Sequence, residues 1–227
     1  MQLIRQATLG LLITVHSLLS FCVNASSESA QPHSQLEAQA LKSLVPFAKR
    51  NQKTLSLSLK SNEVIQLETI DTCKGSEDCE IFRLVGLSPD RQFFVVSVAY
   101  WEGTNVYWIS RSTGTRYEVF DIPQISPDRK HIVTAIPSEA YNVNGVFLWE
   151  IRNGELIKKF HFEPTEYALY SYVRWTTNNS LKLKKFTYAD KAVCPGKQNM
   201  EVRVVLALVG KQWKLNERIG RTTAACQ

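Results

Sequence analysis

The tetrapeptide Ser-Pro-Asp-Arg occurs twice in the chain, in LSPDRQFFVV at residues 87–96 and in ISPDRKHIVT at residues 125–134. Each Ser-Pro-Asp-Arg stands directly before a run of β-branched and aromatic residues. Proline presets φ for the first central position of a turn, and serine and aspartate side chains bond to nearby backbone. We therefore predict a tight corner that leads into a strand at both places.

The similarity continues beyond the tetrapeptide. Residues 106–107 correspond to residues 146–147, and Gly114 corresponds to Gly154, with a spacing of about 40 residues in both cases. Each repeated unit is predicted to consist of a turn, a strand, a hairpin, a strand, a glycine turn and a strand. This length is typical of a four-stranded propeller blade.

The rest of the chain is predicted to form one helix followed by short strands. Helical spacing of apolar residues predicts a short helix over 36–44 that ends before Pro46. The run 93–101 is apolar at both parities, which predicts burial on both faces, and residues 103–105 are expected to form the next turn. Other predicted strands are 54–60, 63–70, 80–87, 106–110, 116–122, 131–136, 145–151, 155–162, 170–175, 181–188, 201–209 and 212–217.

The two copies of Ser-Pro-Asp-Arg, each followed by a hairpin and a glycine turn, resemble the Ser-Pro-Asp-Gly blade signature of WD40-like and TolB-type β-propellers. The resemblance covers residues 86–162, and VRWTTNNSLKL at 173–183 is a weaker third copy that extends it to about 188. Arginine replaces the usual glycine, and the Trp-Asp dipeptide is absent because Trp149 precedes Glu150.

The resemblance and the strand pattern together predict an all-β fold of antiparallel blade-like sheets with a short N-terminal helix. At this period the chain has room for about four blades, so we expect a small or incomplete β-propeller. A β-sandwich is the alternative. The resemblance implies a scaffold that binds other molecules through its loops, although the fold alone does not determine the function.

Residues 1–25 are predicted to be a cleaved signal peptide. Arg5 is their single charge, residues 9–21 form an apolar core, and residues 23–25 offer small side chains for cleavage. An N-terminal membrane anchor is the alternative. We predict a polar linker over 26–35, one β-rich domain over 36–227, no transmembrane segment after cleavage, and a periplasmic or secreted location.

Four of the five cysteines lie beyond the predicted signal peptide. An even number in an exported chain indicates two disulfides. Three pairings are possible, and we favour Cys73–Cys79 and Cys194–Cys226 because each pair lies within one region. No metal site or cofactor is predicted, since no Cys-x-x-Cys pair and no histidine at ligand spacing are present.

The positive charge is concentrated near the C-terminus. The chain has a net charge of +6, and residues 182–227 contain ten of its 27 lysines and arginines beside three acidic residues. One interpretation is a face for lipid headgroups, acidic polysaccharide or an acidic protein; we favour a solvated strand face. Likewise, Lys182 and Lys184 are interpreted as protection of an edge strand rather than as an anion-binding stripe.

No catalytic motif is present. The sequence has no Gly-x-Ser-x-Gly elbow, no His-Glu-x-x-His and no Walker loop. His33, His131 and His161 are interpreted as surface or structural residues. Paired carboxylates can come together from distant positions, so an envelope hydrolase remains the alternative function.

The best binding candidates are aromatic. Tyr100 and Trp101 flank a predicted hairpin tip, and Tyr170 and Tyr172 share a strand face. Exposed tyrosine and tryptophan are enriched in interaction sites, whereas packing in the core is the competing interpretation.

A second candidate is the acidic loop that the predicted Cys73–Cys79 disulfide would close. A rigid loop loses less entropy on binding, so this one is a possible contact for a basic partner. Its acidic residues are Glu77, Asp78 and Glu80. We therefore predict an exported, non-enzymatic protein that binds another protein or an envelope glycan, with an inhibitor or immunity factor as one form. Nucleic-acid binding is not expected.

Overall fold

The computed structural model describes residues 33–72, 79–139, 143–217 and 224–227. The helix α1 (His33–Ser43) begins slightly before the predicted helix and ends before Pro46, as expected. Strands make up most of the remaining described chain. Among the described residues, no helix is long and apolar enough to cross a bilayer.

The strands form four antiparallel sheets, and within each sheet the strands mostly follow chain order. The first sheet contains β1 (Ala48–Asn51), β2 (Thr54–Ser58) and β3 (Val64–Glu68). The second sheet contains β4 (Ile81–Leu87), β5 (Phe93–Tyr100), β6 (Gly103–Ser110) and β7 (Arg116–Glu118).

The third sheet contains β8 (Gln124–Ile125), β9 (His131–Ile136), β10 (Gly145–Arg152) and β11 (Glu155–Phe162). The fourth contains β12 (Ala168–Thr177), β13 (Ser180–Tyr188), β14 (Asn199–Val209) and β15 (Gln212–Glu217), and the short β16 (Ala224–Cys226) pairs with β14. The second and third sheets are therefore four-stranded meanders, which is the strand order of a propeller blade, and the fourth is such a meander extended by β16.

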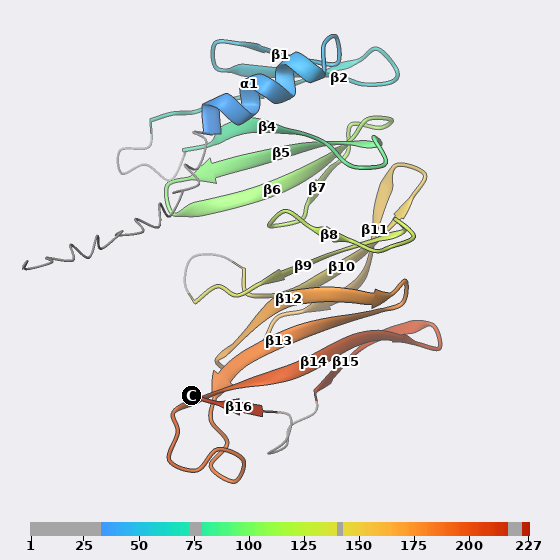
Figure 1. The fold of residues 1–227 in the computed structure, drawn as a ribbon. Coiled ribbons are helices and arrows are strands. Elements are labelled where there is room, and N and C mark those ends of the chain that lie inside the picture. The colour runs from blue at the N-terminus through green and yellow to red at the C-terminus, as the bar shows by residue number, and fades with distance from the viewer. Residues whose placement is uncertain (1–32, 73–78, 140–142, 218–223) are drawn as a thin grey trace, which may run out of the picture. The chain divides into compact units, whose positions relative to one another are not determined.

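Consecutive sheets pack face to face, each pair around its own apolar cluster (Figure 1). Strand β5 shows how the sequence produces this stacking. Phe94 and Val96 belong to the cluster shared with the first sheet, whereas Phe93 and Val95 belong to the cluster shared with the third. The predicted burial of both faces of this strand is confirmed.

The predicted fold class is confirmed: the protein is all-β, with blade-like antiparallel sheets. A two-sheet sandwich does not describe it, because three successive clusters separate four sheets. In the described residues, no apolar cluster joins the first sheet to the fourth. The arrangement is therefore propeller-like and incomplete, and each end sheet keeps one outer face.

The first Ser-Pro-Asp-Arg forms the turn between β4 and β5. The Ser88 N–H donates to the Phe93 carbonyl at 3.0 Å, and the Phe93 N–H donates back to the Ser88 hydroxyl at 3.0 Å. The Ser88 hydroxyl donates to Asp90 at 2.5 Å. One buried serine thus closes the corner through both its backbone and its side chain.

The second copy repeats the same bonds between β8 and β9. Ser126 and His131 exchange hydrogen bonds at 2.9 Å, and the Ser126 hydroxyl donates to Asp128 at 2.7 Å. Arg91 and Arg129 have φ of 58° and 59°, the left-handed region that favours glycine. These arginines stand where the Ser-Pro-Asp-Gly sequence that the two copies resemble has glycine, the residue that adopts this backbone conformation without strain.

The weaker third copy occupies the equivalent position in the fourth sheet. Strand β12 ends at Thr177 and β13 begins at Ser180, so Asn178 and Asn179 form the turn between the first two strands of that sheet. The topology of the sheet thus agrees with the alignment of residues 173–183 as a third blade.

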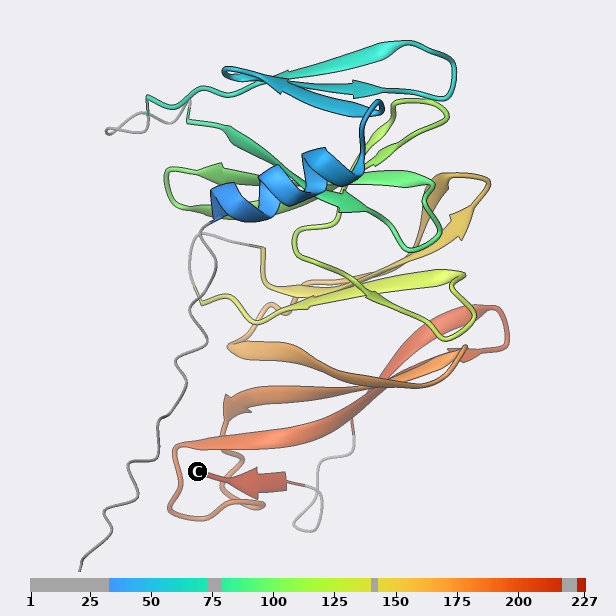
Figure 2. The same cartoon turned by 45° about the horizontal axis from the view of Figure 1, so that its top comes forward.

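Helix α1 is held against the first two sheets by one carboxylate. Oε1 of Glu37 accepts from the Arg50 guanidinium at 2.6 Å and from the Leu84 N–H at 2.9 Å. The same guanidinium donates to the Phe82 carbonyl at 2.6 Å. Figure 2 shows α1 lying along β4.

Two local predictions were wrong. The turn after β5 is formed by Trp101 and Glu102, because Tyr100 already pairs with Gly103 and residues 103–105 belong to β6. Strand β13 lies between β12 and β14, so it is an interior strand. Lys182 and Lys184 therefore do not protect a sheet edge, since both sides of β13 are paired with other strands.

The Cys194–Cys226 disulfide is present, with the two Cα atoms 5.5 Å apart. It joins the loop after β13 to β16. Cys79 is fully buried and disulfide-bonded. Cys73 lies outside the described residues, so the predicted Cys73–Cys79 pairing stays a prediction.

Candidate functional site

A cleft of about 480 Å³ lies at the tip of the β5–β6 hairpin. The hairpin contributes Tyr100, Trp101 and Glu102, and Ile136 at the end of β9 contributes an apolar wall from the third sheet. The segment at and after β7 adds three side chains, which are Glu118, Phe120 and Asp121. The cleft, which we call the acidic aromatic cleft, therefore joins the second and third sheets.

The aromatic pair of the cleft differs in exposure. Trp101 occupies the hairpin turn and is 55% exposed, which is unusual for so large an apolar side chain. Tyr100 is half-buried, and its hydroxyl lies 3.0 Å from that of Tyr107. Burial, and then the hydrogen bond with Tyr107, raises the pKa of Tyr100, so this phenol stays neutral.

Contacts with residues that are near in the fold position Glu118 and Asp121 of the cleft. Glu118 accepts a hydrogen bond from the Asn105 side-chain amide. Phe120 has a φ of 66°, and its ring packs on Phe147 of β10 at 4.5 Å between centroids. The turned backbone at Phe120 places Asp121 at the rim of the cleft.

The charged side chains among the described lining residues of the cleft are all acidic. Glu102, Glu118 and Asp121 are acidic, and the described residues that line the cleft include no lysine, arginine or histidine. The carboxylate of Glu80 adds to the rise in the pKa of Tyr100, although Glu80 does not line the cleft. Glu77 and Asp78 lie outside the described residues.

Tyr170 and Tyr172 lie elsewhere, between the third and fourth sheets. Tyr170 is 1% exposed and donates a hydrogen bond to Glu217, which Lys185 also contacts at 2.8 Å. Burial, and then this bond to Glu217, raises the pKa of Tyr170. A side chain so deeply enclosed offers no surface to a partner.

Tyr172 is half-buried and lines a second cavity of about 220 Å³. Asp121 lines both this cavity and the acidic aromatic cleft, so the two hollows are neighbours at this residue. The buried hydroxyl of Thr134, which lines the second cavity, has no hydrogen-bond partner. Of the four predicted aromatic residues, Tyr100 and Trp101 line the acidic aromatic cleft, whereas Tyr170 and Tyr172 belong to the cluster between the third and fourth sheets.

Sequence reasoning missed the part of the cleft that follows β7. Glu118, Phe120 and Asp121 belong to or follow a three-residue strand, which is too short to show alternation. Within the described residues, no cluster of three histidine, cysteine, aspartate or glutamate side chains has the geometry to hold a metal ion.

Neither His161 nor His131 lines the cleft. His161 is exposed on β11 and pairs with Glu163 at 2.5 Å. His131, at the start of β9, packs edge-on against Trp213 of β15 with 5.4 Å between ring centroids. Its buried Nδ1 has no hydrogen-bond partner. His131 is therefore a packing residue of the interface between the third and fourth sheets.

Burial lowers the pKa of His131, despite the opposing charges of Asp128 and Glu150. The folded protein thus binds this proton less tightly than the unfolded chain. Its contribution to stability is complete above the unfolded pKa of about 6.5 and declines as the pH falls below that value. We predict that the free energy of unfolding decreases between about pH 7 and pH 5.

Urea unfolding at a series of pH values tests this prediction. His131→Phe keeps a ring against Trp213 and should flatten the pH dependence in that range. His161→Phe, at an exposed position, serves as the matched control and should leave the slope in place. A slope that survives in His131→Phe and vanishes in the control would refute the assignment.

Comparison with known proteins finds a likeness only at the level of structure. No family model matches the chain, and no curated protein matches it. A solved structure, the N-terminal domain of Nup159, aligns with a TM-score of 0.33 and 10% sequence identity, over 76% of this chain and 47% of that one. The chain thus spans about half the length of that protein chain. Since this TM-score is low, the architecture rests on the strand pairing described above.

Proposed function

We propose that this protein is an exported, non-enzymatic binding protein whose acidic aromatic cleft receives a lysine or arginine side chain of a partner protein. The observation that carries the proposal is the composition of the cleft: an exposed tryptophan beside three carboxylates, with no cationic side chain among its described lining residues.

A cationic side chain suits each part of this cleft. Tryptophan is the best aromatic partner for a cation, and a charge that is partly desolvated there gains about 0.5–2 kcal/mol. Carboxylates add charge-assisted hydrogen bonds, which are about twice as strong as neutral ones. The apolar surface of Phe120 and Ile136 matches the aliphatic stem of a lysine or arginine.

Two other features support an exported binding scaffold. The Cys194–Cys226 disulfide fits an oxidising compartment, as the apolar N-terminal segment does. The blade signature resembles that of WD40-like and TolB-type propellers, folds that present loops to partners. An inhibitor or immunity factor against a secreted hydrolase is one form of this function.

Affinity capture with matched variants tests the proposal. The oxidised protein is immobilised, exposed to native envelope and secreted extract, and compared with Trp101→Ala and Glu118→Gln. Loss of a central aromatic anchor costs at least about 2 kcal/mol, so Trp101→Ala should weaken retention of the partner about 30-fold. Tyr188→Ala removes an aromatic of somewhat greater exposure, 66%, from the fourth sheet, and this variant should retain the partner fully.

The chemistry of the partner provides the second readout. Acetylation of the lysines of the captured protein, or replacement of its contacting arginine, should abolish retention because the positive charge is lost. Retention that is equal in Trp101→Ala and in the parent protein would refute the proposal. Retention of a glycan that is cleaved, with loss of cleavage in Glu118→Gln, would favour the envelope hydrolase instead.

A further inference from the structure

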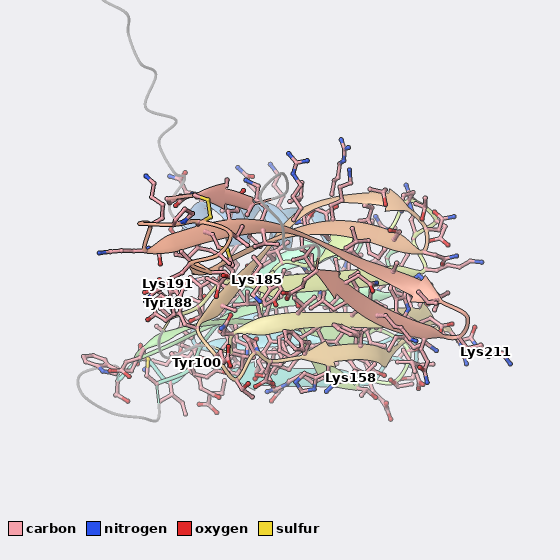
Figure 3. All side chains as sticks on the ribbon, turned by 90° about the horizontal axis from the view of Figure 1, so that it is seen from below. Tyr100, Lys158, Lys185, Tyr188, Lys191 and Lys211 are labelled. Carbon is pink, nitrogen blue, oxygen red and sulfur yellow. A yellow bond between two sulfur atoms is a disulfide. The ribbon has the colours of Figure 1, made fainter. Side chains whose placement is uncertain are left out.

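The outer face of the fourth sheet is unlike the other end of the stack. Alternation and register place five basic side chains on this face, which we call the basic face: Arg174, Lys182, Lys184, Arg203 and Lys214. One acidic side chain, Glu201, lies among them and pairs with Lys184 at 3.1 Å. Figure 3 views the molecule from this side, with Lys191 and Lys211 toward opposite ends of the sheet.

Solvation alone does not explain this charge. The outer face of the first sheet also meets solvent, yet its charged residues are Lys49 and Glu68, which balance each other. Protection of a sheet edge does not explain it either, since β13 is an interior strand.

The basic residues also face one another. Arg174 lies directly opposite Lys182 on the neighbouring strand, and Lys184 lies directly opposite Arg203. Like charges at directly opposite positions destabilise a sheet. Glu201 offsets part of the charge beside Lys184, but five basic side chains against one acidic side chain still leave an excess of positive charge on this face. An anionic partner would relieve the remaining repulsion.

The two-dimensional arrangement of the basic side chains favours a flat anionic surface over a linear polymer. The five side chains occupy three successive outward rows and all four main strands, an area of about 14 Å by 14 Å. A linear polymer would contact one row or one strand, whereas a plane of headgroups meets all of them together. Val209, on the same face and 51% exposed, supplies an apolar side chain that suits the headgroup boundary.

We propose that the basic face docks on an anionic lipid surface. Each lysine or arginine held near such a surface strengthens binding by about fivefold, and the attraction falls as salt screens it. The face lies on the fourth sheet, whereas the acidic aromatic cleft lies between the second and third sheets, so this docking is independent of the proposed partner binding.

Vesicle co-sedimentation of the purified, oxidised protein tests the proposal. Vesicles of equimolar phosphatidylglycerol and phosphatidylcholine are compared with vesicles of phosphatidylcholine alone. The protein used comprises residues 26–227, so that the apolar N-terminal segment makes no contribution to vesicle binding. We expect a strong preference for the anionic vesicles at about 0.05 M salt and its loss at about 0.5 M salt.

Matched variants locate the surface. Lys182→Gln with Arg203→Gln should weaken binding to the anionic vesicles about 25-fold. Lys49→Gln with Lys158→Gln removes the same charge from exposed positions on the first and third sheets and should change binding less than about twofold. Arg174→Gln with Lys214→Gln is a second variant of the basic face, should the first pair melt at a lower temperature than the parent.

Three results would overturn the proposal. The first is equal binding to both kinds of vesicle, and the second is equal weakening in the basic-face and control variants. The third is binding of an acidic polysaccharide such as polygalacturonate, with the same dependence on the basic face, when the vesicles are not bound. That result would assign the face to a polymer instead.

Discussion

Ser126→Ala is expected to lower the free energy of unfolding by about 2 kcal/mol, and Ser88→Ala by a similar amount. Each serine is no more than 2% exposed, and each hydroxyl bonds both a strand N–H and the turn aspartate. Removal of the hydroxyl leaves a buried N–H without its partner, which costs about 1–3 kcal/mol. Thermal unfolding should shift downward by about 4–8 °C in a chain of this size.

Ser61→Ala provides the control for these two variants. Ser61 makes a similar local contact, with its hydroxyl 3.1 Å from Glu63, but it is exposed in the turn between β2 and β3. Water replaces the lost contact there, so the expected change is below about 0.5 kcal/mol. Losses of similar size in all three variants would mean that the buried corners contribute no more than an ordinary solvated turn.

These corners explain why so much of the fold could be read from the sequence. The Ser-Pro-Asp turn determines where a first strand ends and a second begins, and the spacing of about 40 residues shows that the unit recurs. The predicted and observed bounds coincide for β9, β11 and β15, because turn residues flank each of these strands in the sequence. Local chemistry is sufficient here because each blade is built from sequential hairpins.

The features that sequence reasoning missed depend on more distant partners. Whether β13 is an edge strand depends on β14, which pairs with it across an intervening loop. Tyr170 and Tyr172 do share a face, but alternation cannot tell which face of a strand meets the next sheet. The enclosure of Tyr170 follows from the packing of the third sheet on the fourth.

The candidate site likewise contains some residues that the sequence could identify and others that it could not. Tyr100 and Trp101 could be found because a large aromatic pair at a hairpin tip is conspicuous in the sequence. Asp121 and Ile136 could not, since they come from an irregular segment and from a different sheet. Only the stacking of the second and third sheets brings these residues to one cleft.

Removal of the Cys194–Cys226 disulfide is expected to lower the free energy of unfolding by about 3–4 kcal/mol. The two cysteines are 32 residues apart, and the loop that they close contains β14 and β15. In the chain-entropy account, this bond restricts the unfolded chain over the second half of the fourth sheet, from β14 onward. The substitution Cys194→Ala with Cys226→Ala tests it by urea unfolding and leaves Cys79 in its own disulfide.

Hydrogen exchange distinguishes this global effect from a local one. Strand β16 pairs with β14 through three residues only, so without the bond its amides should exchange much faster than those of β13. If the bond only tethers the tail, β16 will lose protection while the free energy of unfolding changes by less than about 1 kcal/mol. A loss of about 3–4 kcal/mol with a larger denaturant slope, by contrast, shows that the unfolded chain has expanded and that the bond stabilises the whole sheet.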